Sequence, residues 1–207
     1  MTLRRVIHAG GVVPSSKAAL RQHLRQQRQQ EPAQAIRQRT AAILGCADQL
    51  LALTSGPIAG FQPTNREPDI SPLLRSLAAR TAIFLPRPTD TALEWLAADQ
   101  SQLIGALTGV PRPVGPTAAT GAQVVTKLGV RLLLVPALAV DPTSGNRLGY
   151  GAGYYDRLLT DIRRWASVLA VGVCRDGELM DLPAEPHDQP VDAVLTESGF
   201  RSLPLAD

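Results

Sequence analysis

Short apolar runs alternate along this chain with longer stretches in which apolar residues recur at helical spacing. The longer stretches predict a first helix that begins at Ser15 or Ser16 and ends near Gln30, and further helices over residues 33–53, 70–79 and 154–162. The apolar runs, each too short for a helix, predict strands over residues 58–61, 82–85, 93–96, 132–135, 167–173 and 191–195. This alternation predicts an α/β fold of three layers, α/β/α, around a central and mostly parallel sheet.

The strand predicted over residues 132–135 leads into a glycine-rich loop. After a proline and a polar turn, Gly149, Gly151 and Gly153 precede the helix that is predicted from Tyr154. Residues without a Cβ can turn their N–H groups inward beside a helix N-terminus, so the loop is a candidate anion site. The glycines alone would equally suit a plain turn between strand and helix. They match neither a P-loop nor a dinucleotide fingerprint.

The side chains around these glycines strengthen the case for a binding site. Arg147 lies before the glycines, Asp156 lies after them, and the three tyrosines of the chain are Tyr150, Tyr154 and Tyr155. Cations, a carboxylate and aromatic hydroxyls therefore surround one loop.

The first predicted helix carries a row of cations. Lys17, Arg21, Arg25 and Arg28 are spaced so that they share one flank of the helix. By pattern alone, the simplest interpretation of such a row is a solvated, charged face.

Length and composition narrow the class of protein. The 207 residues suit a single domain, 1–207, in which residues 1–14 form a loose leader. With 44% hydrophobic and 19% charged residues the chain is globular rather than disordered. The net charge of +3 favours anionic ligands, but the cations form no long run and are not interleaved with aromatic residues, so no nucleic acid is expected as a partner. Two cysteines without metal-ligand spacing, no stretch of 18 apolar residues and no signal peptide predict a cytoplasmic protein without a membrane segment.

The glycine loop carries a family resemblance. The run GNRLGYGAGYYDRLL resembles the signature of the 5-formyltetrahydrofolate cyclo-ligases, also called methenyltetrahydrofolate synthetases, whose pattern is approximately G-x-R-x-G-x-G-x-G-[YF]-Y-D. The segment KAALR resembles the K-x-x-L-R near the start of the same family. The resemblance implies a fold related to the ribose-5-phosphate isomerases and CoA-transferases. It also implies that ATP is bound by Lys17, Arg21, Arg147, Leu148, Gly149, Tyr150, Gly151, Ala152, Gly153, Tyr154 and Tyr155.

The same resemblance implies roles in catalysis, folate binding and metal binding. Arg147 and Tyr154 are the candidates for catalysis. The implied folate site consists of Phe61, Glu67, Asp69, Trp95, Tyr150 and Tyr154. The tail EPHDQPVDAVLTE resembles the family's H-D-x-x-V-D-x-[IV]-x-T-E, which implies that Mg²⁺ is held by Asp156 and Asp192.

Several of these residues also have a structural interpretation. Asp69 would suit the N-terminus of the helix that follows it, Trp95 would suit the core, and Asp156 would suit a pair with an arginine. The chain also departs from the family pattern at two places. Ile70 replaces a usual Thr, and Arg112 takes the place of a usual Glu, which reverses the charge there.

The implied reaction converts ATP and 5-formyltetrahydrofolate into 5,10-methenyltetrahydrofolate, ADP and phosphate, with Mg²⁺ as cofactor and ATP as co-substrate. A formamide oxygen leaves readily only after it has become phosphate, so catalysis would consist mainly of positioning and of neutralising phosphate charge. Two alternatives remain open: a sugar-phosphate isomerase of the same fold, which needs no ATP, and a folate-binding or RNA-associated homologue without turnover. A monomer is expected.

Overall fold

A computed structural model describes residues 7–8, 11–12, 16–64, 67–98, 113–164 and 167–204 of the chain. Within the leader predicted over residues 1–14, β1 (Ile7–His8) pairs antiparallel with β2 (Gly11–Val12). The rest of that leader lies outside the described residues, as does Arg112.

The described residues form one large mixed sheet of eight strands. Their order is β12-β11-β10-β7-β3-β4-β5-β6, with the five strands from β11 to β4 parallel and β12, β5 and β6 antiparallel to their neighbours. The strands are β3 (Ile58–Ala59), β4 (Ile83–Pro88), β5 (Leu93–Ala97), β6 (Ala119–Thr120), β7 (Leu132–Pro136), β10 (Leu169–Val173), β11 (Ala193–Thr196) and β12 (Gly199–Ser202). The predicted mostly parallel sheet is confirmed.

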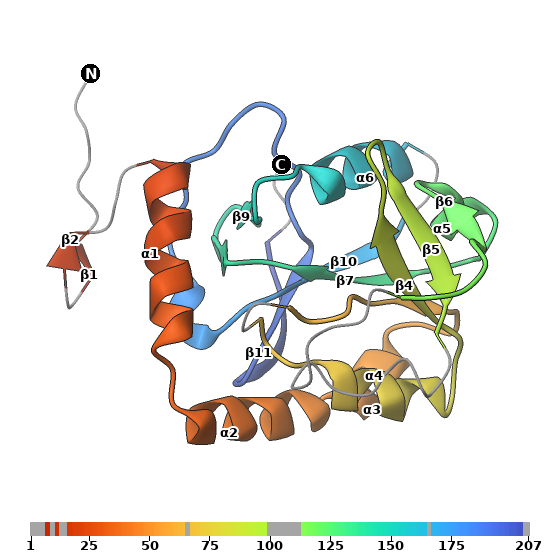
Figure 1. The fold of residues 1–207 in the computed structure, drawn as a ribbon, viewed down its shortest axis with the longest axis horizontal. Coiled ribbons are helices and arrows are strands. Elements are labelled where there is room, and N and C mark those ends of the chain that lie inside the picture. The colour runs from red at the N-terminus through yellow and green to blue at the C-terminus, as the bar shows by residue number, and fades with distance from the viewer. Residues whose placement is uncertain are drawn as a thin grey trace.

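Helices cover both faces of this sheet, which confirms the predicted three layers (Figure 1). On one face lie α2 (Ala33–Leu44), α3 (Ala47–Ala52) and α4 (Ser71–Ala78), and on the other lie α5 (Gln123–Thr126) and α6 (Tyr154–Ile162). Successive residues of β7 point to opposite faces, so Leu132 and Leu134 join one apolar core while Leu133 and Val135 join the other. A central strand buried on both sides accounts for the unbroken apolar run in the sequence.

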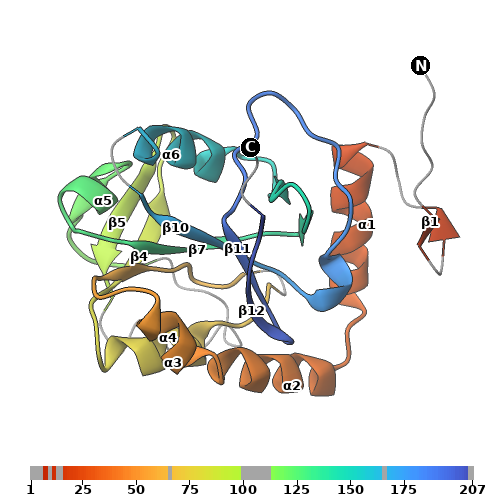
Figure 2. The same ribbon diagram turned by 180° about the vertical axis from the view of Figure 1, so that it is seen from behind.

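The first helix, α1 (Lys17–Gln29), belongs to neither layer and packs at the carboxyl end of β7 (Figure 1). Leu20 and Leu24 meet Leu138 and Leu148 in a third apolar cluster, beside β8 (Ala139–Val140) and β9 (Arg147–Leu148). Ser16 caps the helix, as predicted, by accepting a hydrogen bond from Ala19 N–H at 3.3 Å. From behind, the segment between η2 (Asp176–Glu178) and β11 runs alongside α1 (Figure 2).

The helix predicted after Pro32 and the strand predicted before Pro86 differ in extent from the structure. The helix predicted over residues 33–53 is two helices, because Gly45 ends α2 with its N–H directed to the carbonyls of Ala41 and Ala42. The strand predicted over residues 82–85 continues through Pro86 to Pro88, where it pairs with β5. No helix in the described ranges has the length and apolar character needed to span a membrane.

Candidate functional site

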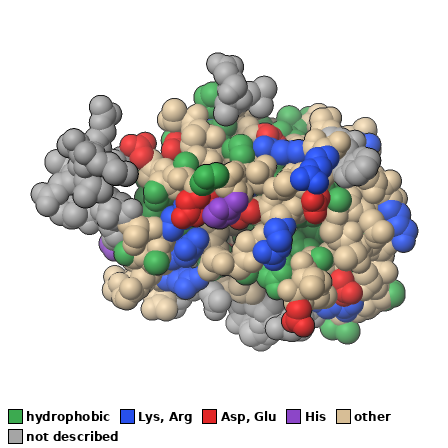
Figure 3. Space-filling model, turned by 90° about the horizontal axis from the view of Figure 1, so that it is seen from above, with side chains coloured by type: hydrophobic (Ala, Val, Ile, Leu, Met, Phe, Trp, Pro, Cys, Tyr) green, Lys and Arg blue, Asp and Glu red, His purple; other side chains and the backbone are tan. Residues whose placement is uncertain are grey.

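A cavity of about 190 Å³ lies between α1 and the start of α6. On the face of the molecule seen from above, basic and acidic side chains gather around a histidine (Figure 3). The cavity itself is lined by Lys17, Arg21, Pro136, Arg147, Gly149, Tyr150, Gly151, Ala152, Gly153, Tyr154, Tyr155, Asp156, Glu185, His187 and Asp188. It therefore joins the first helix, the glycine loop and a late segment of the chain.

Two glycines give the loop a backbone that other residues rarely adopt. Gly151 has a φ of 109°, and Gly153, the N-cap residue of α6, has a φ of 67°. The first N–H groups of a helix have no partner within the helix, and they carry the positive end of its dipole. In α6 these groups belong to the residues that follow Gly153 and line the cavity, so the loop has the construction of an anion site.

The arginines of the cationic row of α1 contact this loop. Arg21 Nε donates to the carbonyl of Gly149 at 2.9 Å, and Arg25 Nη2 donates to the carbonyl of Tyr150 at 2.9 Å. One helical turn further on, Arg28 Nη1 donates to the hydroxyl of Tyr150. Three arginines on one flank thus fix the position of the loop.

Lys17, the first cation of the row, is held by two carboxylates. Its Nζ lies 2.6 and 2.7 Å from the oxygens of Asp188 and 2.9 Å from Oε2 of Glu185. Burial lowers the pKa of Lys17, but the hydrogen bonds to both carboxylates outweigh it and raise the pKa. Burial likewise raises the pKa of Asp188, whereas the Lys17 hydrogen bond brings it below the usual value. Both groups are therefore charged at neutral pH.

Arg147 is buried beneath the loop and is fully engaged there. Its Nη2 donates to Asp156 Oδ1 at 2.9 Å, and its Nη1 donates to the carbonyl of Gln189. Burial lowers the pKa of Arg147, against the opposing charge of Asp156. Asp156 Oδ1 also accepts from Gln189 N–H at 3.2 Å, so both of these hydrogen bonds end on the same oxygen of that carboxylate.

The two tyrosines that open α6 differ in their polar contacts. The hydroxyl of Tyr154 donates to the carbonyl of Thr89 at 2.6 Å, and Arg157 lies over its ring at 5.1 Å from the centroid. The hydroxyl of Tyr155 is buried and has no hydrogen-bond partner among the described residues. Tyr154 is thus a fixed wall of the cavity, and Tyr155 lines the same cavity while its hydroxyl is buried.

Comparison with known proteins decides the family. The model of the 5-formyltetrahydrofolate cyclo-ligase family matches residues 13–197. The chain belongs to this family. A 5-formyltetrahydrofolate cyclo-ligase of Mycolicibacterium smegmatis is 37% identical over 191 residues, which cover 88% of this chain and 94% of that protein. One from Escherichia coli is 40% identical over 68 residues, 32% of this chain and 36% of that protein. The predicted family, and with it the ligase class, is confirmed.

Solved structures agree with this assignment at the level of the fold. The 5,10-methenyltetrahydrofolate synthetase of Aquifex aeolicus is similar with a TM-score of 0.65 and 24% identity, over 92% of this chain and 94% of that one. The synthetase of Mycoplasma pneumoniae is similar with a TM-score of 0.61 and 20% identity, over 86% of this chain and 96% of that one. The α/β fold is therefore shared with both cyclo-ligases.

Among the candidate folate-binding residues, Glu67 lies against Tyr150 of the glycine loop. Its Oε2 accepts hydrogen bonds from the N–H and Oγ1 of Thr64 at 2.6 and 3.1 Å. Burial raises the pKa of Glu67, although the Thr64 bonds, the charge of Arg28 and a hydrogen bond with Tyr150 act to lower it. Burial, and next the charge of Glu67, raise the pKa of Tyr150. The carboxyl and the phenol therefore face each other.

Other residues that were predicted to bind ligands are buried in the apolar cores or hydrogen-bond to the backbone. Phe61 and Trp95 are 3% and 0% exposed in the apolar cores, and Leu148 is 1% exposed against α1. Trp95 also donates its Nε1–H to the carbonyl of Gly121 at 3.1 Å. Its side chain therefore has the buried core position that was the structural interpretation of this residue. Asp69 accepts a hydrogen bond from Ser71 N–H at 2.9 Å at the start of α4, which is the helix-end role.

Asp192, which was expected to hold Mg²⁺ with Asp156, is not among the residues that line the cavity. Asp192 Oδ2 accepts from Ala170 N–H at 2.7 Å, at the start of β10. Its Oδ1 lies 3.1 Å from Nη2 of Arg163, which follows the last residue of α6, whereas Asp156 is in the first turn of that helix. The Asp192 carboxylate therefore accepts a hydrogen bond from the backbone of β10 and pairs with Arg163. Because Arg163 follows the last residue of α6, Asp192 lies at the end of this helix opposite Asp156.

Sequence analysis did not single out the acidic segment that lines the cavity. One ligand atom each from Glu185, His187 and Asp188 lies within 4.8 Å of the others, a spacing that could hold a cation. The H-D pair of the tail motif was the available signal, because it includes Asp188. Arg28 was also missed, since its place in the cationic row does not reveal its partner.

Proposed function

We propose that this protein catalyses the cyclisation of 5-formyltetrahydrofolate to 5,10-methenyltetrahydrofolate with ATP as co-substrate, releasing ADP and phosphate. The family match supports the reaction class. The observation that carries the proposal is the glycine loop at the start of α6, which faces Lys17 and Arg21 across one cavity. An anion loop opposite two cations suits a polyphosphate.

The reaction needs an activated oxygen rather than a protein nucleophile. The formyl oxygen attacks the γ-phosphorus of ATP, and the bond from that phosphorus to the bridging oxygen breaks to release ADP. N10 of the folate then attacks the formyl carbon, the C–O bond breaks, and phosphate leaves with the oxygen while N10 loses its proton. The protein has to align the two substrates and neutralise charge on the transferring group.

The lining residues divide this work. Arg21 and the loop N–H groups would bind the phosphates directly, and Lys17 would exchange its carboxylate partners for phosphate oxygens. Arg147 is 6% exposed, so it contributes positive charge while it holds Asp156 in place. Tyr154, with its hydroxyl tied to Thr89, would form a rigid wall next to the reacting groups.

Mg²⁺ fits the carboxylates of this cavity. Carboxylate oxygens are the protein ligands that Mg²⁺ prefers, and one or two of them are enough when phosphates and water complete the shell. We infer that Asp156 and Asp188, which both line the cavity, would hold the ion, in place of the expected Asp156 and Asp192. When bound with ATP, Mg²⁺ would neutralise phosphate charge.

The deciding experiment follows the absorbance of the methenyl product with and without ATP. Product that forms only with Mg-ATP supports the cyclo-ligase reaction. Binding of 5-formyltetrahydrofolate without absorbance would instead support a non-catalytic homologue. Calorimetry separates the isomerase alternative, because an isomerase should give no heat with Mg-ATP.

A further inference from the structure

A buried ion pair supports the glycine loop from outside the cavity. Arg28, near the end of α1, is 1% exposed. Its Nε and Nη2 donate to the two carboxylate oxygens of Glu178 at 2.7 and 2.6 Å, and Nη2 also donates to the carbonyl of Ala137 at 2.8 Å. The remaining Nη1 donates to the hydroxyl of Tyr150. Four contacts in one plane leave this guanidinium little freedom.

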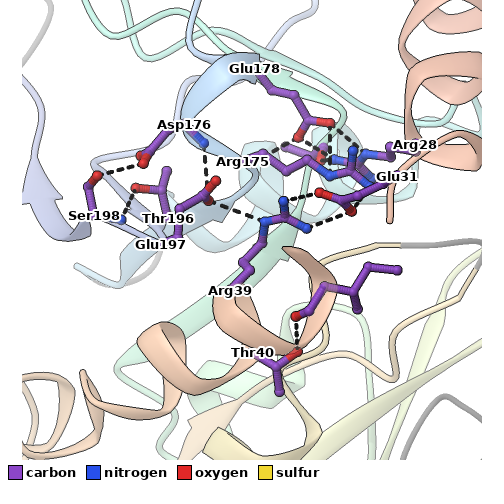
Figure 4. A network of polar contacts seen from close by, with 12 residues as sticks. Arg28, Glu31, Arg39, Thr40, Arg175, Asp176, Glu178, Thr196, Glu197 and Ser198 are labelled. Carbon is purple, nitrogen blue, oxygen red and sulfur yellow. Dashed lines mark hydrogen bonds and ion pairs between the residues drawn. The ribbon is translucent and has the colours of Figure 1, made fainter. Parts of the chain in front are cut away.

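Glu178 is itself fixed by a larger network (Figure 4). Its Oε2 accepts from Arg175 N–H at 2.8 Å, and Arg175 Nη2 pairs with Glu31 at 2.8 Å. Glu31 pairs in turn with Arg39 of α2, whose Nε lies 3.4 Å from Glu197. Three arginines and three glutamates thus alternate in one network that runs from α1 to the end of the sheet. This network fixes the position of the Arg28 guanidinium through Glu178.

Tyr150 is held from more than one side. Arg25 donates to its carbonyl at 2.9 Å and stacks over its ring, with Cζ 5.5 Å from the centroid. Because the phenolic oxygen accepts from Arg28, the single O–H proton of Tyr150 is free to be donated elsewhere. Glu67 is the carboxylate that faces this hydroxyl and interacts with it electrostatically. A chain of contacts therefore runs from Glu178 through Arg28 and Tyr150 to Glu67.

We propose that Arg28 is a positioning residue for the folate half of the site: it fixes the Tyr150 hydroxyl as a donor to Glu67 and so sets the carboxylate that receives the pterin. The proposal rests on the proposed function, because Glu67 and Tyr150 are its folate candidates. Arg28 lies behind Tyr150 and is not among the residues that line the cavity, so it acts through that side chain. The N–H groups of a pterin edge are the donors that a fixed carboxylate recognises.

The proposal predicts a pH effect that a purely structural role would not produce. The groups that face Glu67 are Arg28 from α1, Tyr150 from the loop and Thr64 from its own loop, and each favours the ionised carboxylate. Tyr155 of α6 faces it as well. Loss of the Arg28 charge should raise the pKa of Glu67, so the acid limb of kcat/KM for 5-formyltetrahydrofolate should move to higher pH.

The test uses variants that leave no buried charge unpaired. Arg28→Met combined with Glu178→Met removes both members of the ion pair. Tyr150→Phe removes the hydroxyl alone. A variant that carries all three substitutions completes a double-mutant cycle between the ion pair and the hydroxyl. The matched control is Arg39→Met with Glu31→Met, which removes a pair from the same network without touching Tyr150.

The expected result is selective. The KM for 5-formyltetrahydrofolate should rise about tenfold in the Arg28/Glu178 variant and in Tyr150→Phe, and should rise no further when the two are combined. The KM for ATP should change by less than about twofold, and the acid limb should shift as described. The control should lose thermal stability while keeping both KM values.

Three results would overturn the proposal. These are an unchanged folate KM in the Arg28/Glu178 variant, fully additive effects with Tyr150→Phe, or an equal rise of the folate KM in the control. If the unmodified protein forms no methenyl product, the proposed function fails. The same cycle is then measured as dissociation constants for 5-formyltetrahydrofolate by calorimetry, so the two failures are told apart.

Discussion

Replacing Lys17 by alanine tests both tasks that the structure gives this side chain. The side chains of Lys17 and Asp188 are 12% and 9% exposed, and their charged atoms are 2.6 Å apart. Alanine removes a largely desolvated ion pair and leaves Asp188 with the N–H of Glu185, at 2.7 Å, as a hydrogen-bond donor. It also removes a cation from the wall of the cavity.

The stability effect can be worked out from the two pKa shifts. Asp188 has a folded-state pKa below its usual 3.8, so its pair stabilises the protein above that pH and the stabilisation is lost as the pH falls through the folded-state value. Lys17 has a pKa raised above 10.5, so it stays charged from there down to acid pH. A hydrogen bond between charged groups contributes about 2 kcal/mol, which corresponds to a loss of about 4 to 8 °C in Tm at neutral pH for a domain of this size.

Two measurements check this prediction. Thermal unfolding of Lys17→Ala should show the Tm loss at pH 7, and the difference from the unmodified protein should shrink below pH 3.8. The methenyl absorbance assay should show a KM for ATP that is raised about tenfold or more, for the loss of one charged contact to phosphate. Arg80→Ala is the control, because its pair with Asp48 is 59% and 91% exposed. An unchanged Tm together with an unchanged ATP KM would refute the reasoning.

Three further changes probe the loop and the carboxylates. Gly151→Val should abolish turnover at any ATP concentration that can be reached, because valine rarely adopts a φ of 109° and would obstruct the approach to the loop; near-normal turnover would show that the glycines serve only as a turn. Gly145→Ala should lower Tm more than Gly149→Ala, since a Cβ at residue 145 would lie 2.5 Å from a backbone oxygen while residue 149 has open space; equal Tm values would contradict the close contact. Asp156→Asn should raise the Mg²⁺ concentration needed for half-maximal rate, whereas Asp192→Asn should lower Tm and leave the Mg²⁺ titration unchanged; the opposite pattern would restore Asp192 as the metal ligand.

The layers of the fold and the centre of the site could be predicted from the sequence because they depend on local pattern. The apolar run of β7 is long enough to mark a strand buried on both faces, and the glycines that set the N-terminus of α6 follow it after β8 and β9. Helical spacing also showed that Lys17, Arg21, Arg25 and Arg28 share one flank. It could not show what that flank meets, since Gly149 and Tyr150 lie more than a hundred positions away.

The other residues of the site could not be predicted from the sequence, because the type of a residue does not show whether its side chain is buried. Trp95 and Phe61 have the flat faces that a pterin would favour, yet both side chains are buried in the apolar cores. Asp192 and Asp188 are both acidic residues of one tail motif. A short change in chain direction sends the first to a strand end and the second to the cavity. Their different roles appear only when β10 and α1 are in place.

The placement of α1 also affects synthesis of the protein. Its contacts with the glycine loop and with Asp188 span 128 and 171 positions, so α1 is made long before these partners are. A growing chain that stops before residue 188 has α1 and the glycine loop but lacks Asp188, one of the two carboxylates that hold Lys17. The cavity is therefore completed only after residue 188 has been made.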